Sequence, residues 1–176
     1  MRDGRVEQKE ARLAQWNLLV LNHDMVQGGQ LSLAKMREVN PHIKILAWVP
    51  LQGPHGGLAP GVPPEGENDW YARRADGTML VPHWGGRLMN VYTQQYAWPR
   101  HVLDYVQREC LKPGGYDGLM MDCLWQYEPD QQDVNRDGVH DQRDTQAWQE
   151  GMLFLLRSLH EQYPDAILTG NGGGPW

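Results

Sequence analysis

Short apolar runs alternate with helix-forming stretches along most of this chain, and this alternation constrains the fold more than any other feature. Four apolar runs have the length and composition of strands: residues 16–22, 43–49, 119–124 and 166–169. The first is continuous, which is typical of a strand buried on both faces. Strands that alternate with helices predict a parallel sheet with right-handed crossover connections. The sequence therefore predicts an α/β fold with about four parallel strands.

Three helices are predicted between or beside these strands, at residues 30–39, 98–111 and 146–162. The first should stop at Asn40, because the following proline disfavours helical backbone before it. Pro99 is expected near the first turn of the second helix, where a proline is tolerated. The third helix is expected to be capped by Asp144 or Thr145 and to end before Pro164.

A long insertion separates the second predicted strand from the second of these helices, over residues 51–97. Within it, residues 70–81 are predicted to form a small hairpin that turns at Asp76 and Gly77. Insertions that follow parallel strands often build active sites, because ligands bind at the carboxyl ends of the strands. No internal repeat or linker divides the chain, so residues 1–176 are expected to belong to one domain.

Composition and charge exclude several classes of partner. The net charge is −6, from 22 acidic and 16 basic residues, and the basic residues form no cluster. Nucleic acid is therefore not expected as a partner. No run of 18 apolar residues occurs, so no membrane span is predicted. Eight Trp and seven Tyr stand against one Phe, and aromatic side chains with a polar tip suit a partly wet binding cleft.

The sequence only partly determines the cellular compartment of the protein and the redox state of its two cysteines. The first 15 residues are polar and do not resemble a signal peptide. A cytoplasmic location is expected if Met1 is the true start, and an extracellular one if a preceding segment is missing. Cys110 and Cys123 could form one disulfide, but two free buried thiols are the favoured interpretation.

An acidic segment after the third strand has the spacing of a calcium-binding loop, D-x-N-x-D-G-x-x-D-x-x-D. Calcium prefers six to eight oxygen ligands, and loops of the EF-hand type supply them from fixed positions, with glycine at the sixth. The ligands predicted here are Asp133, Asn135, Asp137, the carbonyl of Val139, Asp141 and Asp144. A structural calcium ion is therefore expected, and the alternative is a solvated acidic loop without metal.

Asp122 is the candidate catalytic residue, because it ends a buried parallel strand at the edge where ligands bind. Its alternative interpretation is a helix N-cap or a salt-bridge partner. Asp117 lies five residues earlier, roughly 16 Å away at strand geometry, so the two carboxylates cannot act as a pair. Asp117 is expected to accept backbone hydrogen bonds at the start of the strand.

Other strand ends are also polar, which favours a binding site shared between strands. The candidate substrate-binding residues are Asn22, His23, Asp24, Trp48, Trp125 and Asn171. Structural alternatives stay open for several of them. His23 would then be a loop histidine with its own partners, and Trp48 a core residue. Asn171 would form a turn, and Trp125 would pack against the long insertion.

The order and spacing of several segments resemble a group of glycoside hydrolases with TIM-barrel domains. The segments are residues 40–48, 70–77, 88–90, 116–122, 133–138 and 164–171. They are most similar to the hypothetical glycosyl hydrolase family 15, and more distantly to the alpha-1,4-polygalactosaminidase-like proteins. The similarity spans about residues 16–172.

This resemblance implies a (β/α)8 barrel in which the four strands correspond to the second to fifth. It also implies that Asp122 is the nucleophile or charge-stabilising carboxylate, and that a carbohydrate is the substrate. The partner acid is expected near the sixth strand, outside this chain. Asp24 and Glu128 are the other acids considered, and neither fits the family pattern. A typical barrel has about 250 residues, so the 176 residues are expected to form a partial TIM barrel without substantial hydrolase activity of its own.

Two alternative functions remain. One is a non-catalytic, calcium-stabilised carbohydrate-binding module, whose sugar affinity would not depend on Asp122. The other is a complete flavodoxin-like α/β domain with another ligand, which would have helices on both faces of its sheet. The oligomeric state is left open.

Overall fold

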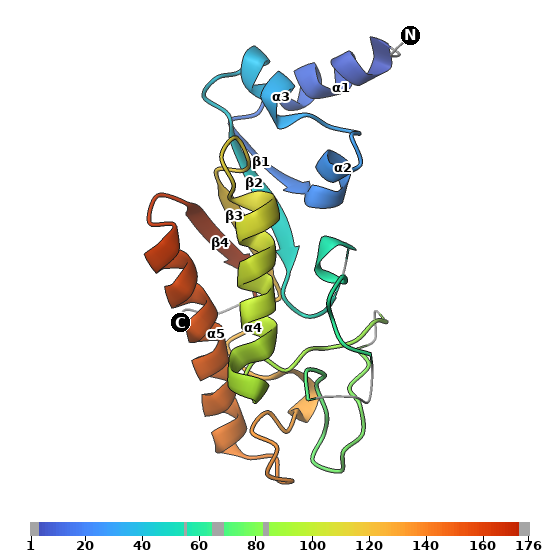
Figure 1. Cartoon of the computed structure of the whole chain (residues 1–176), viewed down its shortest axis with the longest axis vertical. Coiled ribbons are helices and arrows are strands. Elements are labelled where there is room, and N and C mark those ends of the chain that lie inside the picture. The colour runs from blue at the N-terminus through green and yellow to red at the C-terminus, as the bar shows by residue number, and fades with distance from the viewer. Residues whose placement is uncertain (1–3, 55, 65–68, 83–84, 173–176) are drawn as a thin grey trace.

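The computed structural model describes residues 4–54, 56–64, 69–82 and 85–172 (Figure 1). Its centre is one four-stranded sheet with the order β1-β2-β3-β4, in which every neighbouring pair is parallel. The strands are β1 (Leu18–Asn22), β2 (Lys44–Pro50), β3 (Gly118–Asp122) and β4 (Ile167–Asn171). This confirms the predicted α/β fold with four parallel strands.

The predicted helices are also present, together with two that were not expected. The α-helices are α1 (Gly4–Leu13), α2 (His23–Gln27), α3 (Leu33–Val39), α4 (Thr93–Tyr105) and α5 (Gln142–Gln162). Short 3-10 segments lie at Gly56–Leu58 and Pro129–Gln131, and a π-helical turn at Val106–Cys110 extends α4. The helices α1 and α2 were missed, because their sequences are mostly polar and α2 is little more than one turn.

The start of α4 has an unusual backbone. Gln94, Gln95 and Tyr96 have φ angles of 50°, 55° and 65°, in the left-handed region. The regular right-handed helix therefore begins after Tyr96, and Pro99 falls in its first turn, as predicted.

The start of α5 differs from the prediction. The helix begins at Gln142, and its N-cap is Asp141 rather than Asp144 or Thr145. The Asp141 carboxylate accepts the N–H of Arg143, and the Asp144 carboxylate accepts the N–H of Asp141, which completes a capping box.

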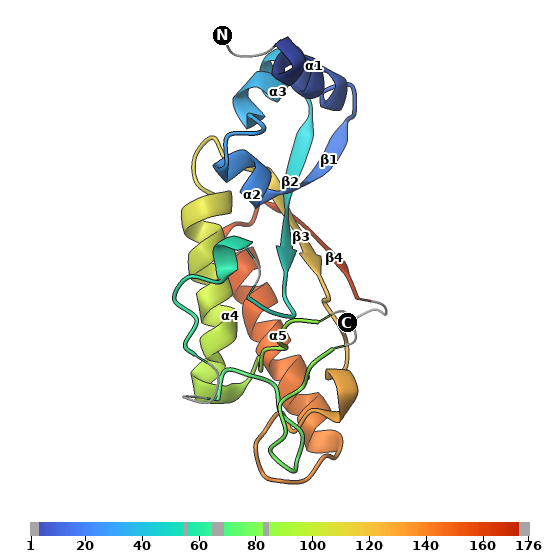
Figure 2. The ribbon, with the colours of Figure 1, turned by 90° about the vertical axis from the view of Figure 1, so that its right-hand side faces the viewer.

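One face of the sheet forms the main hydrophobic core. In Figure 2, α2, α4 and α5 lie on the same side of the sheet. The buried residues that point to this side are Leu21, Ile45, Ala47, Val49, Leu119 and Met121. On the opposite side no helix of the described residues covers the sheet, and large side chains of the two edge strands are exposed.

The exposed edge strands correct one prediction. Leu18 is 53% exposed and Val20 45% exposed, so β1 is not buried on both faces. A continuous apolar run cannot distinguish a strand in the middle of a sheet from one at its edge. Ile167 on the other edge strand is also exposed, whereas Leu46 on central β2 is buried.

The strand order distinguishes the partial TIM barrel from the flavodoxin-like alternative. In a doubly wound sheet the strand order reverses and helices cover both faces. Here the strand order follows the chain order, and the flanking helices lie on one face (Figure 2). The flavodoxin-like alternative is therefore wrong for the described residues, and the arrangement is compatible with part of a (β/α)8 barrel.

The insertion between β2 and α4 has a small hydrophobic cluster of its own. Ala72, Leu80 and Leu88 are buried together, and Trp125 packs against them. The predicted turn at Asp76 and Gly77 is present: the backbone is left-handed at Gly77, and an antiparallel bridge joins Arg73 to Met79.

Cys110 and Cys123 are free thiols, but only Cys110 is buried as expected, and Cys123 is half-buried. None of the helices in the described part of the chain is both long and apolar enough to cross a membrane.

Candidate active site

The carboxylate of Asp122 is the centre of a polar cluster at the carboxyl ends of three adjacent strands. Asp122 is level with Asn171 on β4, and Trp48 on β2 lies on the same face. The indole N–H of Trp48 donates to Oδ2 of Asp122 at 3.2 Å, and the amide of Asn171 donates to Oδ1 at 2.9 Å. The structure thus brings together three of the predicted site residues.

The backbone that follows Asp122 contributes a third donor. Cys123 has a φ of 60°, and its N–H donates to Oδ1 of Asp122 at 3.0 Å. A left-handed non-glycine residue costs about 1–2 kcal/mol, and such strained residues cluster at functional sites. Burial, with a smaller effect of the Asp122 charge, raises the pKa of the Cys123 thiol to about 11. The thiol is therefore protonated at neutral pH, which does not suit a nucleophile.

The next residues hold this turn against β4. The N–H of Leu124 donates to the carbonyl oxygen of Asn171 at 2.9 Å. A Cβ atom at Gly172 would lie 1.9 Å from the carbonyl oxygen of Leu124. A glycine is therefore required where the two segments cross. The hydrogen bonds from Trp48 and Asn171 therefore orient the Asp122 carboxylate from both neighbouring strands.

Asn22 reaches the same edge of the sheet but has a structural role there. It pairs in register with Trp48. Its side-chain oxygen accepts the N–H of Asp24 at 2.9 Å and caps α2. Its predicted role in substrate binding therefore has no support from its hydrogen bonds.

His23 lies behind the sheet, on the side covered by helices. Its ring is buried in edge-to-face contact with Tyr105 and Tyr116. Nδ1 lies 3.3 Å from the Tyr116 hydroxyl, and Nε2 lies 3.9 Å from a carboxylate oxygen of Glu109. Burial lowers the pKa of His23, and the charge of Glu109 opposes this shift. The tyrosine contacts favour a structural role, but His23 begins α2 rather than lying in a loop, and its Nε2 has no hydrogen-bond partner among the described residues.

Asp24 faces a different cavity. It lines an open pocket of about 420 Å³ together with Gly56, Tyr105 and Arg108. A Cβ atom at Gly56 would lie 2.3 Å from the Asp24 carboxylate, so the chain passes close to this side chain. None of the residues that line this pocket belongs to the cluster around Asp122.

Trp125 packs against the long insertion, which was its structural alternative to substrate binding. It contacts the hydrophobic cluster of the long insertion, and its carbonyl oxygen accepts the indole N–H of Trp148 at 2.9 Å. Trp125 thereby joins the insertion to α5.

The acidic loop uses its side chains mainly to bind its own backbone. Asp144 is fully buried, and its Oδ1 accepts the N–H groups of Val134 and Asn135. Asp133 accepts the N–H groups of Asp137 and Gly138. These bonds fold the loop tightly.

On the exposed side of the same loop, two of the aspartates pair with an arginine side chain. The guanidinium group of Arg143 forms ion pairs with Asp137 at 2.9 Å and with Asp141 at 2.8 Å. Val139, whose carbonyl was the fourth predicted ligand, is 52% exposed. Within the described residues no group of three or more His, Cys, Asp or Glu side chains is arranged to hold a metal ion. Calcium binding stays a prediction from the sequence.

Asp117 has the structural role that its position predicted. Its Oδ2 accepts the N–H of Ile45 at 2.9 Å and pairs with Arg37 at 3.0 Å. Glu128, the other acid considered, has a nearly buried side chain that pairs with His140 at 2.9 Å. Among the described residues, neither acid shares a hydrogen bond with the cluster around Asp122.

Two features of the described structure escaped prediction from the sequence, one beside Asp122 and one at Arg136. The N–H of Cys123 becomes a donor only through a left-handed backbone, and no residue type at that position signals it. Arg136 lies close to the insertion, where it donates to the carbonyl oxygen of Tyr71. No role was predicted for this residue from the sequence.

A comparison with known families gives one match. Residues 37–174 match the model of a family described as hypothetical glycosyl hydrolase family 15. The chain matches none of the curated proteins.

Proposed function

Because the chain belongs to the hypothetical glycosyl hydrolase family 15, we propose that it acts in the hydrolysis of a polysaccharide or oligosaccharide, with Asp122 as the carboxylate beside the scissile bond. The observation that carries this proposal is the oriented carboxylate itself. Trp48 and Asn171 hold its two oxygens from the strands on either side. Preorganised groups of this kind are what stabilise a transition state.

The location of Asp122 supports the same role. Active sites of (β/α)8 barrels lie at the carboxyl ends of the strands. Asp122, Trp48 and Asn171 occupy that end, on the face of the sheet that no described helix covers (Figure 2). We propose that this face is the interior of a barrel to which the four strands contribute one side.

Glycoside hydrolysis requires a second carboxyl group. The two groups lie about 5–5.5 Å apart in retaining enzymes and about 6.5–9.5 Å apart in inverting ones. Asp24 lines another pocket and Glu128 is paired with His140, so neither takes this role. The partner acid is proposed to come from a strand beyond these four.

In the proposed reaction Asp122 acts at the anomeric carbon. As a nucleophile, a carboxylate oxygen forms a bond to that carbon while the bond to the leaving oxygen breaks, and water later releases the sugar. As a charge stabiliser, it faces the oxocarbenium-like transition state without forming a bond. In both cases the donors from Trp48 and Asn171 fix the direction in which the carboxylate points.

Covalent labelling tests the role of Asp122 without requiring the partner acid. A 2,4-dinitrophenyl 2-deoxy-2-fluoroglycoside has a leaving group that departs without protonation. Mass spectrometry after incubation should locate the fluoroglycosyl group on Asp122, and Asp122→Asn should remain unlabelled. Labelling of another residue would contradict the assignment.

A charge-stabilising role would give a different result. The chain would stay unlabelled but would bind oligosaccharides with an affinity that falls in Asp122→Ala. Sugar affinity that is unchanged in this variant, with no labelling, would instead support the non-catalytic binding module.

A further inference from the structure

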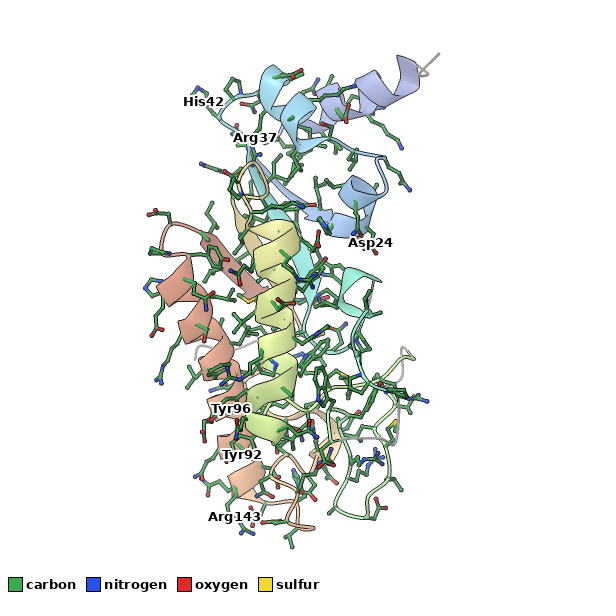
Figure 3. The ribbon with its side chains drawn as sticks, viewed as in Figure 1. Asp24, Arg37, His42, Tyr92, Tyr96 and Arg143 are labelled. Carbon is green, nitrogen blue, oxygen red and sulfur yellow. The ribbon has the colours of Figure 1, made fainter. Side chains whose placement is uncertain are left out.

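An open pocket of about 440 Å³ lies at the start of α4, between the insertion and the acidic loop. It shares no lining residue with the cluster around Asp122. The residues that line it are Asp69, Tyr92, Thr93, Gln94, Gln95, Tyr96, Asn135 and Arg136. Figure 3 shows Tyr92 and Tyr96 close together, Tyr92 just before α4 and Tyr96 within its first residues.

Aromatic rings form one wall of this pocket. The rings of Tyr92 and Tyr96 meet edge to face, with centroids 5.9 Å apart. Tyr96 also stacks on Phe154 of α5, with centroids 4.5 Å apart and an interplanar angle of 20°. Its hydroxyl donates to the carboxylate of Glu150. These contacts fix the tyrosines, so a ligand that stacks on them would lose little entropy in ordering the rings.

Polar residues make up the rest of the lining, and those outside the start of α4 carry planar polar groups. Asn135 has an amide, Asp69 a carboxylate and Arg136 a guanidinium. Arg136 is anchored through its bond to the carbonyl oxygen of Tyr71. The charges of Asp69 and Arg136 balance, which favours a neutral ligand with both donors and acceptors.

The backbone of the pocket is held in place by a buried asparagine. Asn90 is fully buried, and its side-chain oxygen accepts the N–H groups of Tyr92 and Thr93 at 2.8 and 3.1 Å. Its amide donates to the carbonyl oxygen of Val134 at 3.0 Å. Asn90 thus joins the start of α4 to the acidic loop, so the two sides of the pocket are formed before any ligand binds.

We propose that this pocket binds a neutral sugar ring of an oligosaccharide, at a site separate from Asp122. The proposal rests on the carbohydrate substrate proposed above and adds a second place of contact with it. A pyranose ring has apolar C–H faces that pack on aromatic rings, and hydroxyl groups that donate to and accept from planar polar side chains. The pocket offers both kinds of partner in a fixed arrangement.

Isothermal titration calorimetry with cellohexaose, maltohexaose and mannohexaose tests the pocket. At least one of these hexasaccharides should bind, and Tyr92→Ala should weaken its affinity about 2- to 10-fold. Tyr92→Phe should retain the affinity, because the ring rather than the hydroxyl makes the contact. Gln95→Trp, at an exposed position, should also weaken binding by filling the pocket, and it guards against a Tyr92 variant that fails to fold.

Two controls separate this site from the site around Asp122. Tyr127→Ala removes another exposed tyrosine, 60% exposed and outside the pocket, and should leave the affinity unchanged. Any loss of affinity in Asp122→Asn should add to the loss in Tyr92→Ala in the double variant, because the two sites share no lining residue. Affinity that is lost in Asp122→Asn but kept in Tyr92→Ala and Gln95→Trp would overturn the pocket and support the site at Asp122. Absence of binding to all three hexasaccharides would also overturn the pocket, while covalent labelling of Asp122 would still report on the proposed function.

Discussion

Two aspartates of one short segment show how position decides the role of a residue. Asp117 precedes β3, where it accepts a backbone N–H of β2 and pairs with Arg37. Asp122 ends the same strand, where its partners among the described residues are the neutral donors of Trp48, Asn171 and Cys123. The first carboxylate supports the sheet, and the second is the one for which a catalytic role is proposed.

The stabilising role of Asp117 predicts a pH dependence. Burial raises its pKa, but the hydrogen bond from Ile45 and the charge of Arg37 outweigh this effect, so the pKa lies below 3.8. The stabilisation is therefore complete above pH 3.8 and is lost as the pH falls through the lowered pKa. Asp117→Asn should lower the free energy of unfolding at pH 7 by about 1 kcal/mol.

Urea denaturation of both proteins at several pH values checks this prediction. The difference between wild type and Asp117→Asn should shrink as the pH falls from 3.8 toward 2, because protonation removes the charge of Asp117. A difference that stays constant from pH 7 down to pH 2 would show that the charge of Asp117 does not stabilise the fold.

The left-handed backbone at Cys123 makes a second prediction at the residue scale. Cys123→Gly should preserve the turn and raise the free energy of unfolding by about 1 kcal/mol, because glycine adopts this backbone without a Cβ clash. Cys123→Val should be destabilising, since a β-branched side chain tolerates a positive φ poorly. Thermal denaturation compares the two variants, and equal effects of Gly and Val would contradict the strained turn.

At the scale of elements, the acidic loop and the start of α5 form one unit. Asp141 caps the helix, and Asp144 binds the loop backbone from the first turn of the same helix. The prediction of a helix at 146–162 was correct in type, but its start was placed four residues too late. The aspartates that gave the loop its calcium spacing also serve as caps, and the sequence pattern does not separate these roles.

Calcium titration separates the two roles. The sequence predicts that calcium binds the loop, raises Tm, and loses its effect in Asp133→Ala, with calorimetry as the direct measurement. If the aspartates act only as caps, calorimetry detects no binding and EDTA leaves Tm unchanged. In the absence of calcium, removal of the cap by Asp141→Ala should cost about 1 kcal/mol. Because Asp141 is also a predicted ligand, a larger loss in the presence of calcium would support the metal site.

At the scale of the whole molecule, the two faces of the sheet differ. The face toward α4 and α5 carries the main core, and the opposite face has exposed Leu18, Val20 and Ile167 (Figure 2). All-parallel sheets normally have both faces covered. The exposed face therefore supports the proposed barrel interior, with Asp122 at its carboxyl end.

Two valines on the two faces give a matched test of this difference. Val49 is fully buried in the main core, whereas Val20 is 45% exposed. Val49→Ala should lower the free energy of unfolding by about 2 kcal/mol, and Val20→Ala should change it by less than about 0.5 kcal/mol. Chemical denaturation measures both, and equal losses would show that the second face is covered in solution.

The sequence by itself determined the strands, the main helices and the structural role of Asp117. These features depend on local patterns: apolar runs, proline and glycine positions, and carboxylates at strand ends. The sequence also placed Trp48, Asp122 and Asn171 at strand ends, from which a shared site could be predicted once the strands were taken as parallel neighbours.

Only the tertiary structure decided which of the candidate residues meet. His23 and Asp24 follow β1 directly, yet the short helix α2 turns them to the side covered by helices, away from Asp122. The exposure of β1, the strained turn at Cys123 and the tyrosine pocket on α4 depend on contacts between segments far apart in the chain. Such contacts follow from the packing of whole elements, which no local pattern of residues specifies.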